Sequence, residues 1–153
     1  MSGGLERFAL LAGLSESGRR VLAERLDWLD VESGTQVFEE GEPADALLLV
    51  LEGRIRLWSE RRQADGEVGP GSALGALSLV VEGPREATAR TLTACRLLRL
   101  TREGFVALRT AAPEAACKLL EGVVRESAVF ARDALAHLSD RAERSVDRSP
   151  ASQ

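Results

Sequence analysis

Glycines divide the middle of this 153-residue sequence into short apolar runs. From Trp28 to Leu100 these runs have the length and spacing of β-strands rather than helices. The glycines that separate them are Gly34, Gly41, Gly53, Gly66, Gly69, Gly71, Gly75 and Gly83. Several short strands separated by turn residues are typical of an antiparallel roll or sandwich, which is the fold predicted for this region.

The clearest pair of predicted strands surrounds Gly53. Residues 46–51 are apolar throughout, whereas residues 54–58 alternate polar and apolar side chains. Because a glycine in a two-residue connection supplies the positive φ of a tight turn, the pattern predicts a β-hairpin. The first strand is expected to be central, since it is apolar on both faces, and the second to have one solvated face.

Helical patterns lie on both sides of this region. Residues 5–14 have the apolar spacing of a short amphipathic helix. Ser15 is the expected N-cap of a second helix that runs through about Leu26. On the other side, Thr101 is expected to cap a short helix through Leu108.

A long helix is predicted to begin at Pro113, because a proline in the first helical position loses no hydrogen bond. It is expected to end near Asp140, and the charged residues 141–153 are predicted to form a flexible tail. The predicted domain therefore spans residues 1–140, with N-terminal helices in 5–26, a β-roll in 27–100 and C-terminal helices in 101–140.

An apolar seam follows the long helix. Its members recur at alternating steps of four and three, and they are Leu120, Val124, Ser127, Ala131, Ala134 and Leu138. Other apolar residues widen the seam into a broad face, so the helix is expected to pack partly on the roll and partly on the same helix of a second copy. A single intramolecular amphipathic helix is the alternative. The seam predicts a homodimer.

Composition excludes several classes of function. The net charge is −4 and aromatic residues are 4% of the chain, so neither a DNA footprint nor a stacking platform for single strands is expected. One histidine and two distant cysteines build neither a metal site nor a catalytic triad, so no metal and no enzyme activity are predicted. No apolar run spans a membrane and the N-terminus does not resemble a signal peptide, which favours a cytoplasmic protein.

One segment has the layout of an anion site. Gly75 allows a sharp turn into a short helical segment, 76–79, whose free N–H groups can bind an anion. Arg85 on the following strand can add a bidentate contact to the same anion. Leu77 and Leu79 are expected to anchor the segment in the core. A solvated arginine after Pro84 is the alternative interpretation of Arg85.

Several short motifs follow one another along the chain: Gly34-Thr35, Glu40-Gly41-Glu42-Pro43-Ala44-Asp45, Leu51-Glu52-Gly53, Gly69-Pro70-Gly71, Leu74-Gly75-Ala76-Leu77-Ser78-Leu79 and Pro84-Arg85. In this order they resemble the motifs of the cyclic nucleotide-binding domain family, the sensory β-roll of catabolite-activator-like proteins. The resemblance implies an α+β fold: an antiparallel β-roll of the double-stranded β-helix or jelly-roll type, with N-terminal helices and a long C-terminal helix. The helix-turn-helix domain of such transcription factors is not expected after residue 140, and neither is direct DNA binding.

The resemblance also implies a ligand site, from which this sequence departs at two positions. Ala76 replaces a glutamate that accepts a hydrogen bond from the ribose, a loss of about 1.5–3 kcal/mol. Glu86 replaces a small residue beside the cyclic phosphate, and its carboxylate would cost on the order of 1 kcal/mol in water and about 4 kcal/mol at an effective dielectric of about 20. Glu86 is also able to pair with Arg85 or to point into solvent. Ser78 offers an additional hydroxyl.

The resulting prediction is a stand-alone regulatory or adaptor domain, degenerate for cAMP and cGMP, that acts through a homodimer and an unidentified protein partner. Alternatives are a functional sensor of a cyclic mononucleotide or cyclic dinucleotide, and a purely structural scaffold subunit. Phe130 either stacks on a base or fills the pocket, and the backbone N–H groups of residues 76, 77 and 87 would help to hold a phosphate. The predicted ligand-binding residues are Gly75, Ala76, Leu77, Ser78, Arg85, Glu86, Ala87 and Phe130.

Overall fold

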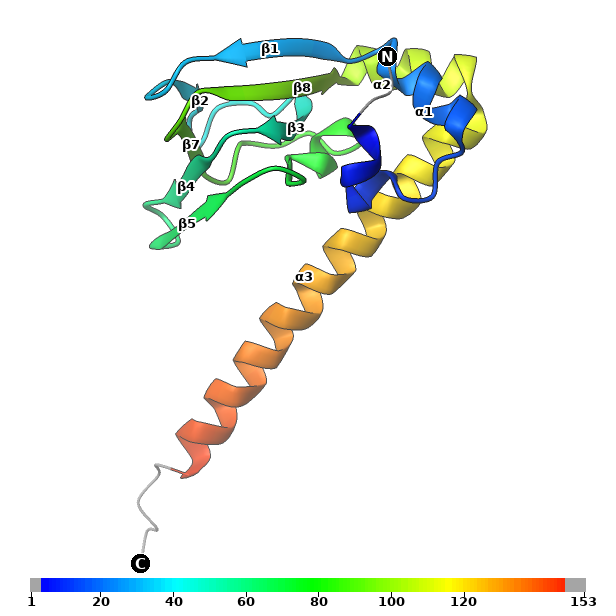
Figure 1. The fold of residues 1–153 in the computed structure, drawn as a ribbon. Coiled ribbons are helices and arrows are strands. Elements are labelled where there is room, and N and C mark those ends of the chain that lie inside the picture. The colour runs from blue at the N-terminus through cyan, green and yellow to red at the C-terminus, as the bar shows by residue number, and fades with distance from the viewer. Residues whose placement is uncertain (1–3, 148–153) are drawn as a thin grey trace, which may run out of the picture.

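Two four-stranded antiparallel sheets enclose an apolar interior and are flanked by helices in the computed structural model, which describes residues 4–147 (Figure 1). The first sheet has the strand order β1 (Asp27–Val31), β8 (Cys95–Thr101), β3 (Ala46–Glu52) and β6 (Ala73–Leu74). The second has the order β2 (Gln36–Phe38), β7 (Thr88–Thr91), β4 (Ile55–Ser59) and β5 (Ala64–Val68). The predicted α+β fold with an antiparallel β-roll is confirmed.

Strand β3 is buried on both faces, which explains its continuous apolar run. Leu48 and Val50 face the second sheet, where they pack in one cluster with Ile55. Leu47 and Leu49, between them in the sequence, pack in the other cluster with the helices. Since successive strand residues point to opposite faces, a central strand covered on both sides must be apolar at every position.

The predicted hairpin around Gly53 is wrong. β3 belongs to the first sheet and β4 to the second, so the chain crosses from one sheet to the other at this glycine. Gly53 does have the predicted positive φ, +95°, and a Cβ there would lie 2.5 Å from the Ala94 carbonyl oxygen. The crossing runs beside the segment that links β7 to β8, where the Leu92 N–H donates to the Arg54 carbonyl oxygen at 2.9 Å.

The helices follow the predicted caps. The Ser15 hydroxyl accepts from the Gly18 N–H at the start of α1 (Glu16–Ala23), and Thr101 accepts from the Gly104 N–H at the start of α2 (Arg102–Ala111). Before α1, the chain forms two 3₁₀ turns, η1 (Leu5–Arg7) and η2 (Ala9–Leu11), instead of the single helix predicted over 5–14. Gly4, Phe8 and Ala12 bound these turns.

The last helix, α3 (Pro113–Asp147), begins at the predicted proline and extends past the expected end near Asp140. Residues 141–147, predicted to be tail, are therefore helical, and 148–153 lie outside the described residues. The first turns of α3 pack on the body through Ala115, Ala116, Leu119 and Val123. Beyond them the helix projects away from the roll (Figure 1). Between residues 4 and 147, no helix is long and apolar enough to span a membrane.

Candidate anion-binding pocket

A pocket of about 700 Å³ lies between the second sheet, the segment of residues 74–79 (the cassette) and α3. The cassette supplies residues from Leu74 to Ser78, and the segment that leads into β7 supplies residues from Pro84 to Ala87. α3 closes one side with Val123, Glu126 and Ser127. Every predicted ligand-binding residue with a described side chain therefore lines one pocket. Phe130 belongs to α3, but its side chain lies outside the described part of the structure.

The turn at Gly75 has the predicted geometry. Gly75 has a φ of +75° and precedes η3 (Ala76–Leu79), a single 3₁₀ turn. The Ser78 N–H donates to the Gly75 carbonyl oxygen at 3.0 Å, and the Ser78 hydroxyl donates to the same oxygen. The hydroxyl that was expected to serve a ligand thus closes the turn. Leu79 is buried as predicted, but Leu77 is 52% exposed at the pocket, so its predicted role as an anchor is wrong.

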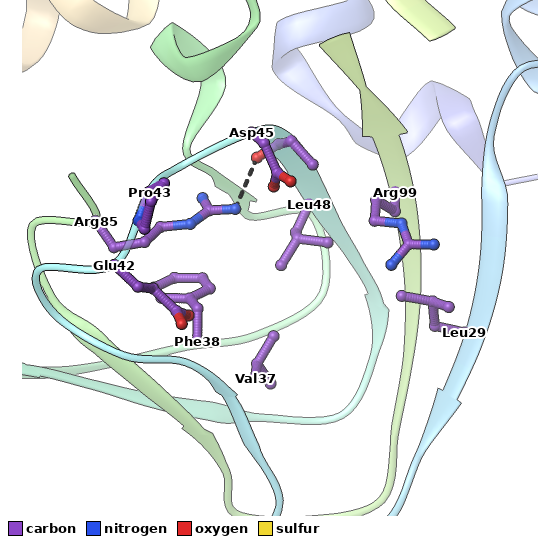
Figure 2. Close-up of a pocket in the computed structure, with 10 residues that line it drawn as sticks. Leu29, Val37, Phe38, Glu42, Pro43, Asp45, Leu48, Arg85 and Arg99 are labelled. Carbon is purple, nitrogen blue, oxygen red and sulfur yellow. Dashed lines mark hydrogen bonds between the residues drawn. The ribbon is translucent and has the colours of Figure 1, made fainter. Parts of the chain in front are cut away.

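Arg85 is buried, which excludes the alternative of a solvated arginine. Its side chain is 7% exposed and extends past Pro43 with its guanidinium carbon 4.4 Å from the centre of the Phe38 ring (Figure 2). Nη2 donates to the Ala46 carbonyl oxygen at 3.1 Å. Nη1 is fully buried and has no hydrogen-bond partner among the described residues. It lies so close to Gly75 that a Cβ there would collide with it.

Two opposing influences act on the charge of Arg85. Burial lowers the pKa of its guanidinium, and the carboxylates of Asp45 and Glu42 act in the opposite direction. Both carboxylates lie with Arg85 around a smaller cavity of about 150 Å³ (Figure 2). A buried donor without a partner costs about 1–3 kcal/mol, and more when it is charged. A phosphate oxygen at Nη1 would recover that cost, because charge-assisted bonds from guanidinium to phosphate are strong.

Glu86 points away from Arg85. Its carboxylate pairs with Arg62 at 3.2 Å, and its side chain is 69% exposed. The predicted possibility of a pair with Arg85 is therefore wrong, and the possibility of a solvent-directed carboxylate is confirmed. Ala76 and Ala87 both line the pocket, and Ala76 brings no side-chain acceptor to it.

Sequence reasoning missed the groups that position Arg85. Phe38 and the Ala46 carbonyl come from strands 47 and 39 residues earlier, and no local pattern links them to the cassette. It also placed Ser127 on the dimer seam, whereas this residue lines the pocket. The glycine at position 75 was the one available signal, since it marks a close approach of another group to the backbone.

The residues of the predicted seam on α3 lie in three different environments: the core, the pocket and the exposed surface. Leu120 packs against the core and Ser127 lines the pocket. Val124 and Leu138 are 66% and 59% exposed, and Ala131 is exposed as well. Ala134 lies in the helix, but its side chain is outside the described part. The helix therefore presents an apolar face that nothing in residues 4–147 covers.

Comparison with known proteins identifies the class. Residues 28–111 match the family model described as cyclic nucleotide-binding domain. The chain is 31% identical to the CRP-like cAMP-activated global transcriptional regulator of Mycobacterium tuberculosis, over 79% of this chain and 56% of that protein. It therefore belongs to the cyclic nucleotide-binding domain family, and spans little more than half the length of that relative.

Solved structures agree with this assignment. The N-terminal domain of a transcriptional regulator from Streptomyces coelicolor is 32% identical, with a TM-score of 0.72 over 82% of this chain and 93% of that one. The catabolite activator protein of Thermus thermophilus is 27% identical, with a TM-score of 0.73 over 86% of this chain and 63% of that one. Among the side chains that the structure describes, no group of three or more His, Cys, Asp or Glu is arranged to hold a metal ion.

Proposed function

We propose that this chain is a regulatory module that binds a cyclic nucleotide through its phosphate, in the pocket beside Arg85. The observation that supports the proposal is the buried Nη1 of Arg85, which lies against the Gly75 turn and has no hydrogen-bond partner in the part of the chain that the structure describes. A buried, charged donor without a partner is costly to keep unless a ligand uses it. The name of the mycobacterial relative describes it as cAMP-activated, so cAMP is the first ligand to test.

Binding is expected to be weak, because one of the two residues that differ from the family's ligand site still removes a contact. Ala76 offers no acceptor to a ribose hydroxyl, a loss of about 10- to 100-fold in affinity. The second departure is less severe, since Glu86 is directed toward Arg62. If the missing hydrogen bond at Ala76 abolishes binding, the chain acts as the predicted degenerate adaptor, which functions without a ligand.

Signalling is proposed to pass through α3 and a second copy of the chain. Val123 and Ser127 of α3 line the pocket, so a bound ligand would contact the helix directly. Val124 and Leu138 leave an apolar face exposed on the same helix. A ligand that favours one packing of α3 would shift the equilibrium of the helix pair, which a protein partner can recognise.

Calorimetric titration with cAMP, cGMP and cyclic dinucleotides tests the ligand. Wild type is expected to bind at least one weakly, Ala76→Glu to bind about 10- to 100-fold more tightly, and Arg85→Met to lose binding. The Arg85→Met change removes the cation while keeping an apolar side chain of similar length, so a thermal melt serves as its folding control. No heat from wild type or Ala76→Glu at millimolar ligand would leave the ligand-independent adaptor as the function.

Sedimentation velocity tests the helix pair. The wild-type chain is expected to be a dimer at high micromolar concentration, and Leu138→Lys a monomer, because a charge on the seam opposes burial. Ser139→Lys adds the same charge beside the seam and is expected to leave the dimer intact. A monomeric wild type would contradict the homodimer.

A further inference from the structure

A pair of oppositely charged residues lies at the edge of the pocket. Arg62 Nη2 is 3.2 Å from Glu86 Oε2, and both side chains are more than half exposed. Glu86 follows Arg85 directly and lines the pocket, but its carboxylate is paired outward. Exposed pairs of this kind contribute little to stability, so the main physical consequence of the pair is where it holds the two side chains.

The turn that carries Arg62 is held in place by Glu40. The Arg62 N–H donates to the Ser59 hydroxyl at 3.1 Å, and that hydroxyl donates to Glu40 Oε1 at 2.8 Å. Glu40 Oε2 accepts from the Glu60 N–H at 3.1 Å, and Oε1 from the Arg61 N–H at 3.3 Å. The connection between β4 and β5 is therefore built around one carboxylate from the segment after β2.

The segment that contains Glu40 also holds the backbone around Arg85. The Glu40 N–H donates to the Thr88 hydroxyl at 3.0 Å, and the Gly41 N–H donates to the Arg85 carbonyl oxygen at 2.8 Å. One segment thus fixes both ends of the Arg62–Glu86 pair. The backbone at Arg62 and the backbone beside Glu86 are therefore held near each other by hydrogen bonds that do not depend on the pair itself.

We propose that Arg62 is a positioning residue for the ligand pocket: it holds the Glu86 carboxylate outward, so that Arg85 remains available to an anion. This inference rests on the proposed binding of a cyclic nucleotide at Arg85. A carboxylate within about 4 Å of a bound phosphate would weaken binding about fivefold in water, and more where water is excluded. Arg62 prevents that repulsion by neutralising and directing Glu86.

The experiment is a double-mutant cycle on the full chain, with cAMP as the titrant in calorimetry. Arg62→Gln is expected to weaken binding about fivefold or more, and Arg62→Lys to retain most of the affinity. Glu86→Gln is expected to bind as tightly as wild type or more tightly. In the Glu86→Gln background, Arg62→Gln is expected to change affinity less than about twofold, because no carboxylate remains to be positioned.

Arg61→Gln is the matched control, since it removes the same charge from the same turn without touching the pair. It is expected to change affinity less than about twofold. Equal losses in Arg61→Gln and Arg62→Gln, or an equal loss from Arg62→Gln with and without Glu86, would overturn the inference while leaving the proposed function intact. No binding by wild type, Ala76→Glu or Glu86→Gln would instead refute the proposed function, and the inference with it.

Discussion

The guanidinium of Arg85 lies over the ring of Phe38, with its central carbon 4.4 Å from the ring centre. This contact fixes the plane of the guanidinium, so that one nitrogen reaches the Ala46 carbonyl and the other reaches the Gly75 turn. An aromatic face attracts a cation without neutralising its charge. Phe38 therefore holds the arginine in place and leaves it able to bind an anion.

Replacing Phe38 with leucine is expected to weaken cAMP binding. The contact of a cation with an aromatic face contributes about 0.5–2 kcal/mol, which corresponds to about 2- to 30-fold in affinity. Phe38→Tyr keeps the aromatic face and is expected to bind like wild type. Calorimetry compares the three proteins, and equal affinities for Phe38→Leu and wild type would contradict the role of the ring.

Substituting alanine for Gly75 is expected to reduce both stability and binding. The left-handed backbone at this residue, φ +75°, costs a non-glycine residue about 1–2 kcal/mol. The new Cβ would also displace Nη1 of Arg85, which should lower affinity for cAMP at least ~10-fold. Gly83→Ala is the control, because a Cβ at Gly83 meets nothing within 4 Å. Urea unfolding and calorimetry measure the two effects, and equal behaviour of the two variants would be evidence against the proposed close approach.

At Gly122, α3 lies close against the N-terminal turn η2. A Cβ at this position would lie 2.9 Å from the carbonyl carbon of Leu10 and would collide with its oxygen. Gly122→Ala is therefore expected to lower the free energy of unfolding by about 1–3 kcal/mol, as overpacked sites do. Gly13→Ala places a Cβ 3.5 Å from Lys118, an ordinary contact, and is expected to be neutral. Urea denaturation decides, and an unchanged midpoint for Gly122→Ala would show that the helix can move away without cost.

The carboxylate of Glu40 is expected to make stability depend on pH. The Ser59 hydroxyl and two backbone N–H groups lower the pKa of Glu40 from its ordinary value of 4.5. A group whose pKa is lower in the folded state stabilises the fold above its unfolded pKa, and this contribution is lost as the pH falls through the folded pKa. The difference in unfolding midpoint between wild type and Glu40→Gln should therefore be largest near neutral pH and shrink on acidification.

Glu39→Gln is the control for this prediction, since Glu39 precedes Glu40 and does not bind the turn through its side chain in the described contacts. Thermal melts from about pH 7 to about pH 3 measure the effect. A constant difference between Glu40→Gln and wild type over that range would exclude the carboxylate as the titrating group.

Local signals in the sequence predicted where helices and turns begin better than they predicted which strands pair. Ser15, Thr101 and Pro113 mark helix starts in the structure because capping depends on neighbouring residues alone. Gly53 marks a turn correctly, but a turn signal does not reveal which sheet the next strand joins. α3 continues past its predicted end near Asp140, since no glycine or proline separates Asp140 from Asp147.

The same holds for the candidate site: its local features could be predicted, but contacts between distant segments could not. The sequence indicated Gly75 and Arg85, because a turn glycine and an arginine in this order have a local meaning. It did not indicate that Glu86 would pair with Arg62, since the two residues lie on different segments and meet only when the roll closes. The structural role of Glu40 was equally hidden, because its partners begin 19 residues later.

The crossing of the chain between sheets at Gly53 has a consequence for how the roll forms. In the described chain, β4 and β5 are the one pair of bonded strands that follow each other directly in sequence. β1 must wait for β8, whose Arg99 meets Asp27 across 72 residues, and β2 must wait for β7. Chains dominated by such distant pairings fold slowly, because loops must close before contacts stabilise them. On the ribosome, the second sheet needs β7, which ends at Thr91, and the first sheet needs β8, which ends at Thr101, so the nascent domain is expected to gain most of its structure late.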